Sequence, residues 1–148
     1  MDFRDLREYL EALEEAGELK VIEGVDWDLE IGAIAELVGE KKGPTLLFDK
    51  IRGYPQGYRV VANLFSNPKQ YCLPFGLSAD IPELEAIHWW KEKLKNFTPI
   101  KPREVNTGPV MENVQAGKDV DMLRFPTPRW HELDGGEIHR HGLYGDNS

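Results

Sequence analysis

The densest cluster of side chains that could carry out chemistry lies near the C-terminal end of this 148-residue sequence. It consists of histidines and carboxylates: His131, Glu132, Asp134, Glu137, His139 and His141. Imidazole and carboxylate groups suit zinc or manganese, and histidines two positions apart would share one face of a strand. However, glycines interrupt the segment, and a metal site needs support from rigid elements. We therefore favour a solvated tail, with a metal site as the alternative.

Cys72 and the Trp89-Trp90 pair are further candidates. The segment Tyr71–Pro74 contains no Lys, Arg or His that would lower the pKa of the thiol, which favours a buried, inert cysteine over a nucleophile. The two tryptophans could form a recognition surface, but we expect one ring in the core and the other half-buried. His88 is interpreted as a surface or hydrogen-bonded histidine. The sequence has no Walker loop, no Gly-x-Gly-x-x-Gly and no nucleophile elbow.

The overall charge argues against a nucleic-acid partner. The formal net charge is −8, and an acidic surface repels phosphate backbones. The N-terminus is charged from Asp2 onward, and no apolar run approaches the roughly 20 residues that span a bilayer. Cys72 is the only cysteine, which suits a reducing compartment. We expect a cytoplasmic protein without nucleic-acid or membrane partners.

Hydrophobic periodicity predicts an α+β fold, an α/β layer with a mixed sheet. Helices are expected over Asp2–Ala16, Asp28–Val38 and Pro82–Lys95, and strands over Glu18–Ile22, Thr45–Phe48, Arg59–Phe65 and Val110–Val114. We expect Asp2 to cap the first helix. The strand over Arg59–Phe65 is nearly continuously apolar and is therefore predicted to be central. The third helix is predicted to turn one apolar face inward, formed by Leu84, Ile87, Trp90 and Leu94.

Blocks spread in order from residue 3 to residue 136 resemble the UbiD family of decarboxylases. They are Phe3–Leu10, Gly17–Leu19, Asp28–Ile31, Gly43–Phe48, Gly53, Asn63–Phe65, Gly76-Leu77, Asp119–His131 and Asp134–Gly136. The most specific block is Asp119–His131, which contains the run Phe-Pro-Thr-Pro-Arg-Trp-His. Any one block is a weak signal, whereas the ordered set is a strong one.

The resemblance implies an N-terminal α/β domain, a split β-barrel domain that holds prenylated FMN, manganese and potassium, and a C-terminal oligomerisation domain. It also implies reversible, non-oxidative decarboxylation of an aromatic or α,β-unsaturated acid, with the flavin as electron sink. The family's flavin, metal and catalytic motifs lie downstream of the block that matches Asp134–Gly136. We therefore assign no catalytic, cofactor-binding or metal-binding residue in this sequence and expect none of these cofactors on this chain.

Three segments are expected: an α/β domain over residues 1–104, the start of the barrel domain over 105–136, and a tail over 137–148. The tail departs from the family pattern, which continues as Arg-Tyr-Ile-Gly-Thr-Gly. One permitted set of codons for Glu137–Ser148, read one base later, encodes that continuation. We therefore interpret the tail as the product of a shifted reading frame.

The expected function is that of the N-terminal portion of a UbiD-like decarboxylase, inactive by itself and completed by the remaining part of such a protein. One alternative is a non-catalytic assembly or interaction module. Another is the remnant of a disrupted gene, in which unpaired strand edges and apolar faces would favour self-association.

Overall fold

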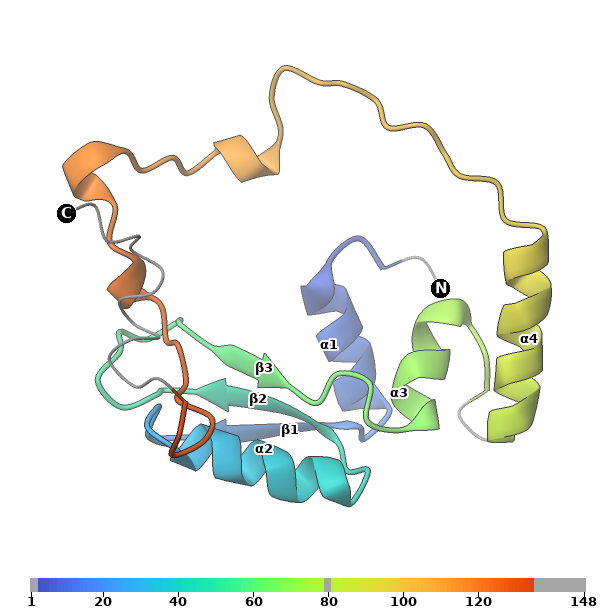
Figure 1. Cartoon of the computed structure of the whole chain (residues 1–148), viewed down its shortest axis with the longest axis horizontal. Helices are drawn as coiled ribbons and strands as arrows, with labels where there is room; N and C mark the ends of the chain where they lie inside the picture. The colour runs from blue at the N-terminus through green and yellow to red at the C-terminus, as the bar shows by residue number, and fades with distance from the viewer. Residues whose placement is uncertain (1–2, 79–80, 135–148) are drawn as a thin grey trace.

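The computed structural model describes residues 3–78 and 81–134 (Figure 1). Its α-helices are α1 (Leu6–Glu15), α2 (Glu30–Glu40), α3 (Pro68–Cys72) and α4 (Glu83–Lys95), and its strands are β1 (Leu19–Glu23), β2 (Thr45–Asp49) and β3 (Val60–Ala62). Short 3-10 helices follow as η1 (Leu73–Phe75), η2 (Pro109–Met111), η3 (Gly117–Asp119) and η4 (Met122–Arg124). Helices and a mixed sheet confirm the expected α+β class. None of the helices in the described ranges is long and apolar enough to cross a membrane.

The strands form one sheet in the order β1-β2-β3. β1 pairs with β2 in parallel, with Leu19 opposite Thr45, and β2 pairs with β3 antiparallel, with Leu46 opposite Ala62. Parallel neighbours need a crossover connection, and α2 provides it. The central strand is β2, in which the four residues Thr45–Phe48 are all buried.

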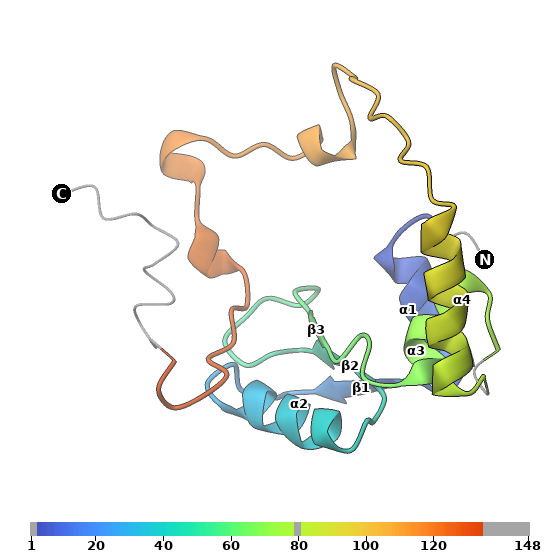
Figure 2. The same ribbon diagram turned by 45° about the vertical axis from the view of Figure 1, so that its right-hand side comes forward.

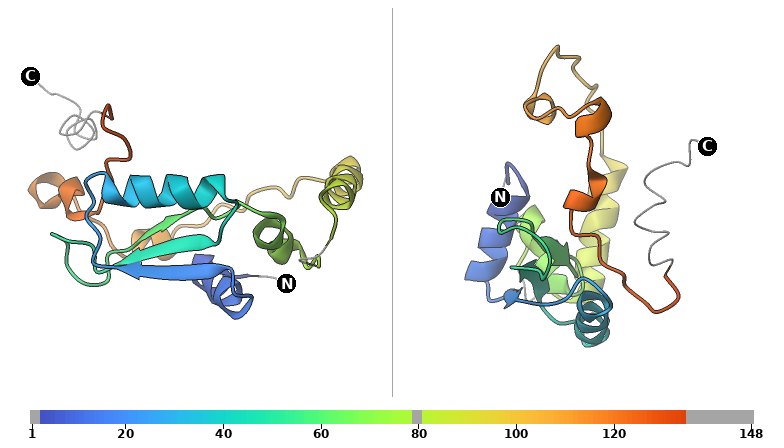
Figure 3. Two further views of the ribbon diagram at one scale, coloured as in Figure 1. Left: turned by 90° about the horizontal axis from the view of Figure 1, so that it is seen from below. Right: turned by 90° about the vertical axis from the view of Figure 1, so that its left-hand side faces the viewer.

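Helices cover both faces of the sheet, α2 on one side and α1 on the other (Figure 3). Because successive side chains of a strand point to opposite faces, β2 contributes to both layers. Phe48 packs with Ile31 and Ala35 of α2. On the other side, Leu13 of α1 is fully buried in a cluster that includes Tyr9 and half-buried Val61. The core is therefore split into two layers by the sheet.

Two strand predictions were wrong. The segment predicted as a central strand, Arg59–Phe65, pairs only over Val60–Ala62 and lies at the edge of the sheet. Its valines are half-buried because β3 has a neighbouring strand on one side only. The strand predicted over Val110–Val114 is instead the 3-10 helix η2 followed by bends. Among the described residues no strand lies beside this segment to accept its backbone hydrogen bonds, which a strand requires.

The three long helices, α1, α2 and α4, were predicted correctly, but the cap of α1 and the short helix α3 were not. The cap of α1 is Asp5 rather than Asp2, which is outside the described residues. The Asp5 carboxylate accepts hydrogen bonds from the backbone N–H groups of Arg7 and Glu8. The bonds from Glu8 and then Arg7 lower the pKa of Asp5 below its ordinary value. The short helix α3 was not predicted, because five residues give too little periodicity to detect.

Residues 96–130 leave the end of α4, run away from the sheet and return to it (Figures 1 and 2); we call this segment the arm. Apolar side chains along it lie in solvent, including Ile100 at 93% exposure and Val110 at 86%. The arm contains three 3-10 helices and bends in place of barrel strands. A split barrel that begins within residues 105–136 stays a prediction.

Tyr9 links the α1 layer to the start of α3, and its hydroxyl should make stability sensitive to alkaline pH. The hydroxyl donates to the carbonyl oxygens of Gln70 at 2.9 Å and Leu64 at 3.2 Å. Burial raises the pKa of Tyr9 to about 12, from the ordinary value of about 10 in an unfolded chain. The folded state therefore binds the Tyr9 proton more tightly than the unfolded state does. The contribution of the protonated hydroxyl to the unfolding free energy is complete below about pH 10 and declines toward pH 12.

We expect Tyr9→Phe to be less stable than wild type at neutral pH by about 1 kcal/mol, the net value of a buried hydrogen bond. Its stability should fall less than that of wild type between pH 10 and 12, because the titrating group is gone. Urea unfolding at a series of pH values measures both effects. Parallel curves for the two proteins above pH 10 would contradict the assignment. Tyr71, whose pKa burial also raises, is present in both proteins and cancels in the comparison.

Candidate functional site

The end of the arm is fastened to the beginning of α2. Arg129 donates its backbone N–H to the carbonyl of Trp27 and accepts from the N–H of Leu29, both at 3.0 Å. Its guanidinium Nε lies 2.5 Å from a carboxylate oxygen of Asp28. We call these contacts, together with the one between Gly32 and Trp130, the Arg129 bridge. It joins the Asp28–Ile31 block to the Asp119–His131 block, two of the segments singled out in the sequence.

Gly32 of α2 lies close against the backbone of Trp130. It is buried in the first turns of α2, and a Cβ atom there would lie 2.1 Å from the carbonyl oxygen of Trp130 and 2.7 Å from its Cα. Contacts that short with backbone atoms cannot be relieved by rotating a side chain. The absence of a side chain at Gly32 is therefore what allows the arm to lie against α2.

The proposed metal cluster is not assembled among the residues that the structure describes. One Asp134 carboxylate oxygen accepts from the backbone N–H groups of Trp130 at 3.1 Å and His131 at 3.0 Å, which makes it the cap of a turn. His131 is exposed and points its Nδ1 toward Glu36, 4.0 Å away. Within residues 3–78 and 81–134 no group of three or more His, Cys, Asp or Glu could hold a metal ion. Glu137, His139 and His141 lie outside the described residues.

Charged side chains gather beyond the carboxyl ends of β1 and β2, an edge of parallel strands that often binds ligands. Arg52 binds Glu30 at 3.1 Å, lies 3.8 Å from Asp26 and donates to the carbonyl of Gly24 at 2.7 Å. Lys50 pairs with Glu23 at 2.8 Å, and this hydrogen bond raises the pKa of Lys50. The charges at this edge are thus paired with one another. They connect the turn that precedes α2 with the turn that follows β2.

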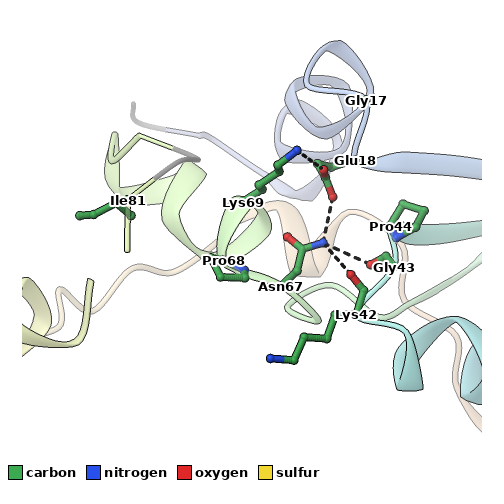
Figure 4. A pocket seen from close by; sticks show the side chains of 9 residues that line it. All are labelled: Gly17, Glu18, Lys42, Gly43, Pro44, Asn67, Pro68, Lys69 and Ile81. Atoms are coloured by element: carbon green, nitrogen blue, oxygen red, sulfur yellow. Dashed lines mark hydrogen bonds and ion pairs between the residues drawn. The ribbon is translucent and has the colours of Figure 1, made fainter. Parts of the chain in front are cut away.

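An open hollow of about 440 Å³ lies at the opposite edge of the sheet, where β1 and β2 begin (Figure 4). Its lining residues are Gly17, Glu18, Lys42, Gly43, Pro44, Asn67, Pro68, Lys69 and Ile81. The Asn67 side-chain amide donates to a Glu18 carboxylate oxygen at 2.9 Å and to the carbonyls of Lys42 at 3.2 Å and Gly43 at 3.3 Å. Lys69 lies 3.4 Å from the other Glu18 oxygen. The polar groups of the hollow therefore mainly satisfy one another.

Asn67 also starts α3. Its side-chain oxygen accepts from the backbone N–H of Gln70, while the Gln70 side chain accepts from the N–H groups of Asn67 and Ser66. Gln70 is fully buried and donates to the carbonyl of Gly43 at 3.1 Å. This reciprocal capping was missed in the sequence, although Asn-x-x-Gln just before an apolar run, here Tyr71–Leu73, is its signature.

The other candidates from the sequence are Cys72, His88 and the Trp89-Trp90 pair. Cys72 is buried, and burial raises the pKa of its thiol, as expected of an inert cysteine. His88 is exposed on α4, as expected. The expectation that one tryptophan is core was wrong, because Trp89 and Trp90 are both half-buried, with ring centroids 5.9 and 4.3 Å from that of Phe75. The short segment η1 covers only one side of the pair.

Both the sequence and the fold are similar to those of known proteins. Residues 10–87 match the 3-octaprenyl-4-hydroxybenzoate carboxy-lyase N-terminal domain, the UbiD N-terminal domain. The chain is 36% identical to pyrrole-2-carboxylic acid decarboxylase of Pseudomonas aeruginosa, over 95% of this chain and 29% of that protein. It is also 28% identical to the vanillic acid decarboxylase of Sedimentibacter hydroxybenzoicus in its open and closed forms. The TM-scores are 0.77 and 0.78, with 89% of this chain covered and 29% and 28% of those chains.

The matches define the class as the N-terminal domain of a carboxy-lyase. The chain belongs to the UbiD family. It spans less than a third of the length of the relatives to which it was matched. The matching relatives are named as decarboxylases of aromatic acids.

UbiD-family decarboxylases use prenylated FMN, so the described residues were tested for a fit to that group. A flavin phosphate and its metal need a cluster of charged or metal-ligating side chains, and the described part of the chain has no such His, Cys, Asp or Glu group. The glycines of the turns, Gly17, Gly24, Gly53 and Gly57, have open space where a side chain would project, so they do not form a backbone cradle. The described residues do not fit the cofactor, and no step of the reaction is derived from them.

Gly32→Ala should break the Arg129 bridge. The added methyl group would clash with the Trp130 backbone, although alanine favours a helix over glycine by about 1 kcal/mol. We expect hydrogen exchange at the N–H groups of Leu29 and Arg129 to become at least roughly tenfold faster. A tenfold change corresponds to a decrease of about 1.4 kcal/mol in the free energy of local opening. Exchange measured by NMR tests this.

Gly39→Ala is the matched control on the same helix. A Cβ at Gly39 would meet the Asn63 side chain at an ordinary 3.7 Å, so this variant should gain about 0.5–1 kcal/mol in unfolding free energy with unchanged exchange at the bridge. Equal exchange in both variants would show that the close contact at Gly32 does not hold the arm.

Asn67→Asp should destabilise the α3 end of the sheet in a pH-dependent way. The carboxylate would keep the cap to Gln70 but face the Glu18 carboxylate at the 2.9 Å distance now spanned by a hydrogen bond. We expect a loss of about 1–3 kcal/mol at pH 7, which shrinks as the pH falls and the pair takes up a proton. Asn67→Ser, which loses the same donor without adding charge, should lack this pH dependence. Urea unfolding of both variants at neutral and acidic pH measures it.

Proposed function

We propose that the chain is the N-terminal portion of a UbiD-type non-oxidative decarboxylase of aromatic or α,β-unsaturated carboxylic acids, and that it is inactive by itself. The observation that supports this most strongly is the Arg129 bridge. It brings together two blocks, Asp28–Ile31 and Asp119–His131, whose resemblance to the family was recognised separately in the sequence. Their contact gives both blocks a common structural role.

The proposed inactivity rests on the roles of the polar side chains that are described. Asp28 and Arg129 pair with each other, Glu30 pairs with Arg52, and Glu18 is bound by Asn67 and Lys69. An acid, a base or a cofactor ligand must have a free position for its partner. In this proposal the chemistry comes from the rest of a family protein, which supplies prenylated FMN, manganese and potassium.

We also propose the division of the chain into an α/β domain over residues 1–104 and the start of a flavin-binding barrel domain over 105–136. In that division the exposed apolar side chains of the arm are covered by the remainder of the barrel. The tail over 137–148, proposed to be translated in a shifted frame, lies outside the described residues. Its origin is decided by the DNA sequence, in which a UbiD-like frame should continue just downstream.

The function can be tested in a chimera. Residues 1–136 of this chain would replace the matching segment of the pyrrole-2-carboxylic acid decarboxylase of P. aeruginosa, which is 36% identical. We expect the chimera, supplied with prenylated FMN and manganese, to release CO₂ from pyrrole-2-carboxylate. The isolated chain should release none and should not take up the flavin spectrum.

The matched control is the same chimera with Gly32→Ala, which should lose most of its activity if the Arg129 bridge positions the flavin domain. Gly39→Ala in the chimera should leave activity unchanged. A chimera that is folded and flavin-loaded but inactive, beside an active parent enzyme, would contradict the proposal. So would turnover by the isolated chain. A chimera that binds a partner yet never turns over would favour the alternative of an assembly module.

A further inference from the structure

α4 is an amphipathic helix that packs on the rest of the molecule by one face only. Ala86, 1% exposed, lies on that face, with the Trp89 and Trp90 rings against Phe75. At the outer edge of the molecule, α4 stands beside α3 and away from α2 (Figures 1 and 2). Its own contacts are therefore confined to the side that faces η1 and α3.

Of the four apolar side chains predicted to point inward from α4, Trp90 is half-buried against Phe75, whereas the other three lie in solvent. Leu84 is 73% exposed, Ile87 54% and Leu94 61%. Their spacing of three and seven residues places them in one stripe along the helix. An apolar stripe on a helix is normally buried against another surface, and nothing in the described part of the chain covers this one, which only Lys91 interrupts.

The charges of α4 are unequally distributed along its length. Glu83 and Glu85 lie in the first turn, whereas Lys91, Lys93 and Lys95 lie in the second half with a single carboxylate, Glu92. The helix dipole has the opposite sense, about half a positive charge at the start and half a negative charge at the end, so it offsets only part of the whole charges of these side chains. An antiparallel copy of the same helix would place the acidic half of each against the basic half of the other.

We propose that α4 pairs with α4 of a second copy of this chain, antiparallel and about a twofold axis, with the Leu84–Ile87–Leu94 stripe at the centre. A twofold interface must be complementary to itself, and the charge distribution of α4 has this property in the antiparallel orientation only. A parallel pair would bring like charges together. Lys91 lies in the stripe, and its long side chain can extend along the apolar surface with the ammonium group at the rim.

This dimer does not depend on the proposed decarboxylase function, because it uses the outer face of α4 and none of the Arg129 bridge. The arm is also exposed and apolar, but its side chains follow an irregular backbone and carry no self-complementary charge pattern. α4 is therefore the surface on which a second copy is specified.

The first test removes the apolar stripe. Sedimentation velocity of the full 148-residue chain across the micromolar range should show a dimer, and Ile87→Gln should raise its dissociation constant by roughly tenfold or more. The matched control is Leu37→Gln on α2, a leucine that is 57% exposed outside α4, which should leave the dissociation constant unchanged. Circular dichroism confirms that both variants are folded.

The second test exchanges the charges. Glu83→Lys/Glu85→Lys gives α4 five lysines and one glutamate, and Lys91→Glu/Lys95→Glu gives it five glutamates and one lysine. Each variant alone should be monomeric where wild type is dimeric, and an equimolar mixture should form a heterodimer that weakens as salt is raised. The two charge-exchanged variants change no residue of the Arg129 bridge, so the outcome of the chimera experiment does not depend on this interface.

A wild-type chain that stays monomeric throughout the micromolar range would overturn the proposal and leave the stripe to be covered by another polypeptide. A dimer that survives Ile87→Gln but is lost in Leu37→Gln would also overturn it, by placing the interface elsewhere. Failure of the two charge-exchanged variants to associate when mixed would exclude the antiparallel arrangement. Heterodimer formation by the mixture, with neither variant dimeric alone, would establish it.

Discussion

The burial of β2 on both faces is the constraint on which the rest of the structure depends. Phe48 and Leu46 require a cover on one side, and the layer around Leu13 is needed on the other. Since an uncovered apolar strand would expose side chains worth roughly 1.5–3 kcal/mol each, neither α1 nor α2 can be absent while the sheet stays folded. The positions of the hollow around Asn67 and of the Arg129 bridge follow from this burial, because the two lie at opposite ends of the sheet that α1 and α2 cover.

The polar contacts at these two ends solve the same physical problem. Strand and helix ends leave backbone groups without partners, and here side chains and distant backbone supply them. At one end Gln70 and Asn67 satisfy the turn before β2 and the first turn of α3. At the other end the backbone of Arg129 pairs with Trp27 and Leu29 just before α2. Charged side chains of types common in active sites, Glu18, Asp28 and Arg129, are thus used here to hold segments together.

The sequence was sufficient for the class of fold and for the family, but not for the strand order or the arm. Periodicity located α1, α2, β1 and α4, whereas β2 was located by its apolar run, Thr45–Phe48. It could not tell that β2, rather than β3, is central, because both are apolar and the difference lies in which neighbours pair with them. The inward orientation expected of Leu84, Ile87 and Leu94 failed because an amphipathic pattern shows that a face needs cover but not whether the same chain provides it. Neither Gly32 nor Asn67 stood out, since their importance lies in contacts with residues far along the chain.

The Arg129 bridge also turns the described polypeptide into a closed loop, because Asp28 and Arg129 are 101 residues apart. The entropy of closing a loop grows only with the logarithm of its length, and doubling the length adds about 0.6 kcal/mol. Inserting or deleting a few residues in the arm therefore changes closure by less than about 0.1 kcal/mol, whereas one added methyl group at Gly32 meets a backbone atom at 2.1 Å. Evolution can accordingly lengthen or shorten the arm with little effect on folding. The contact between Gly32 and Trp130, by contrast, tolerates no added side chain at Gly32.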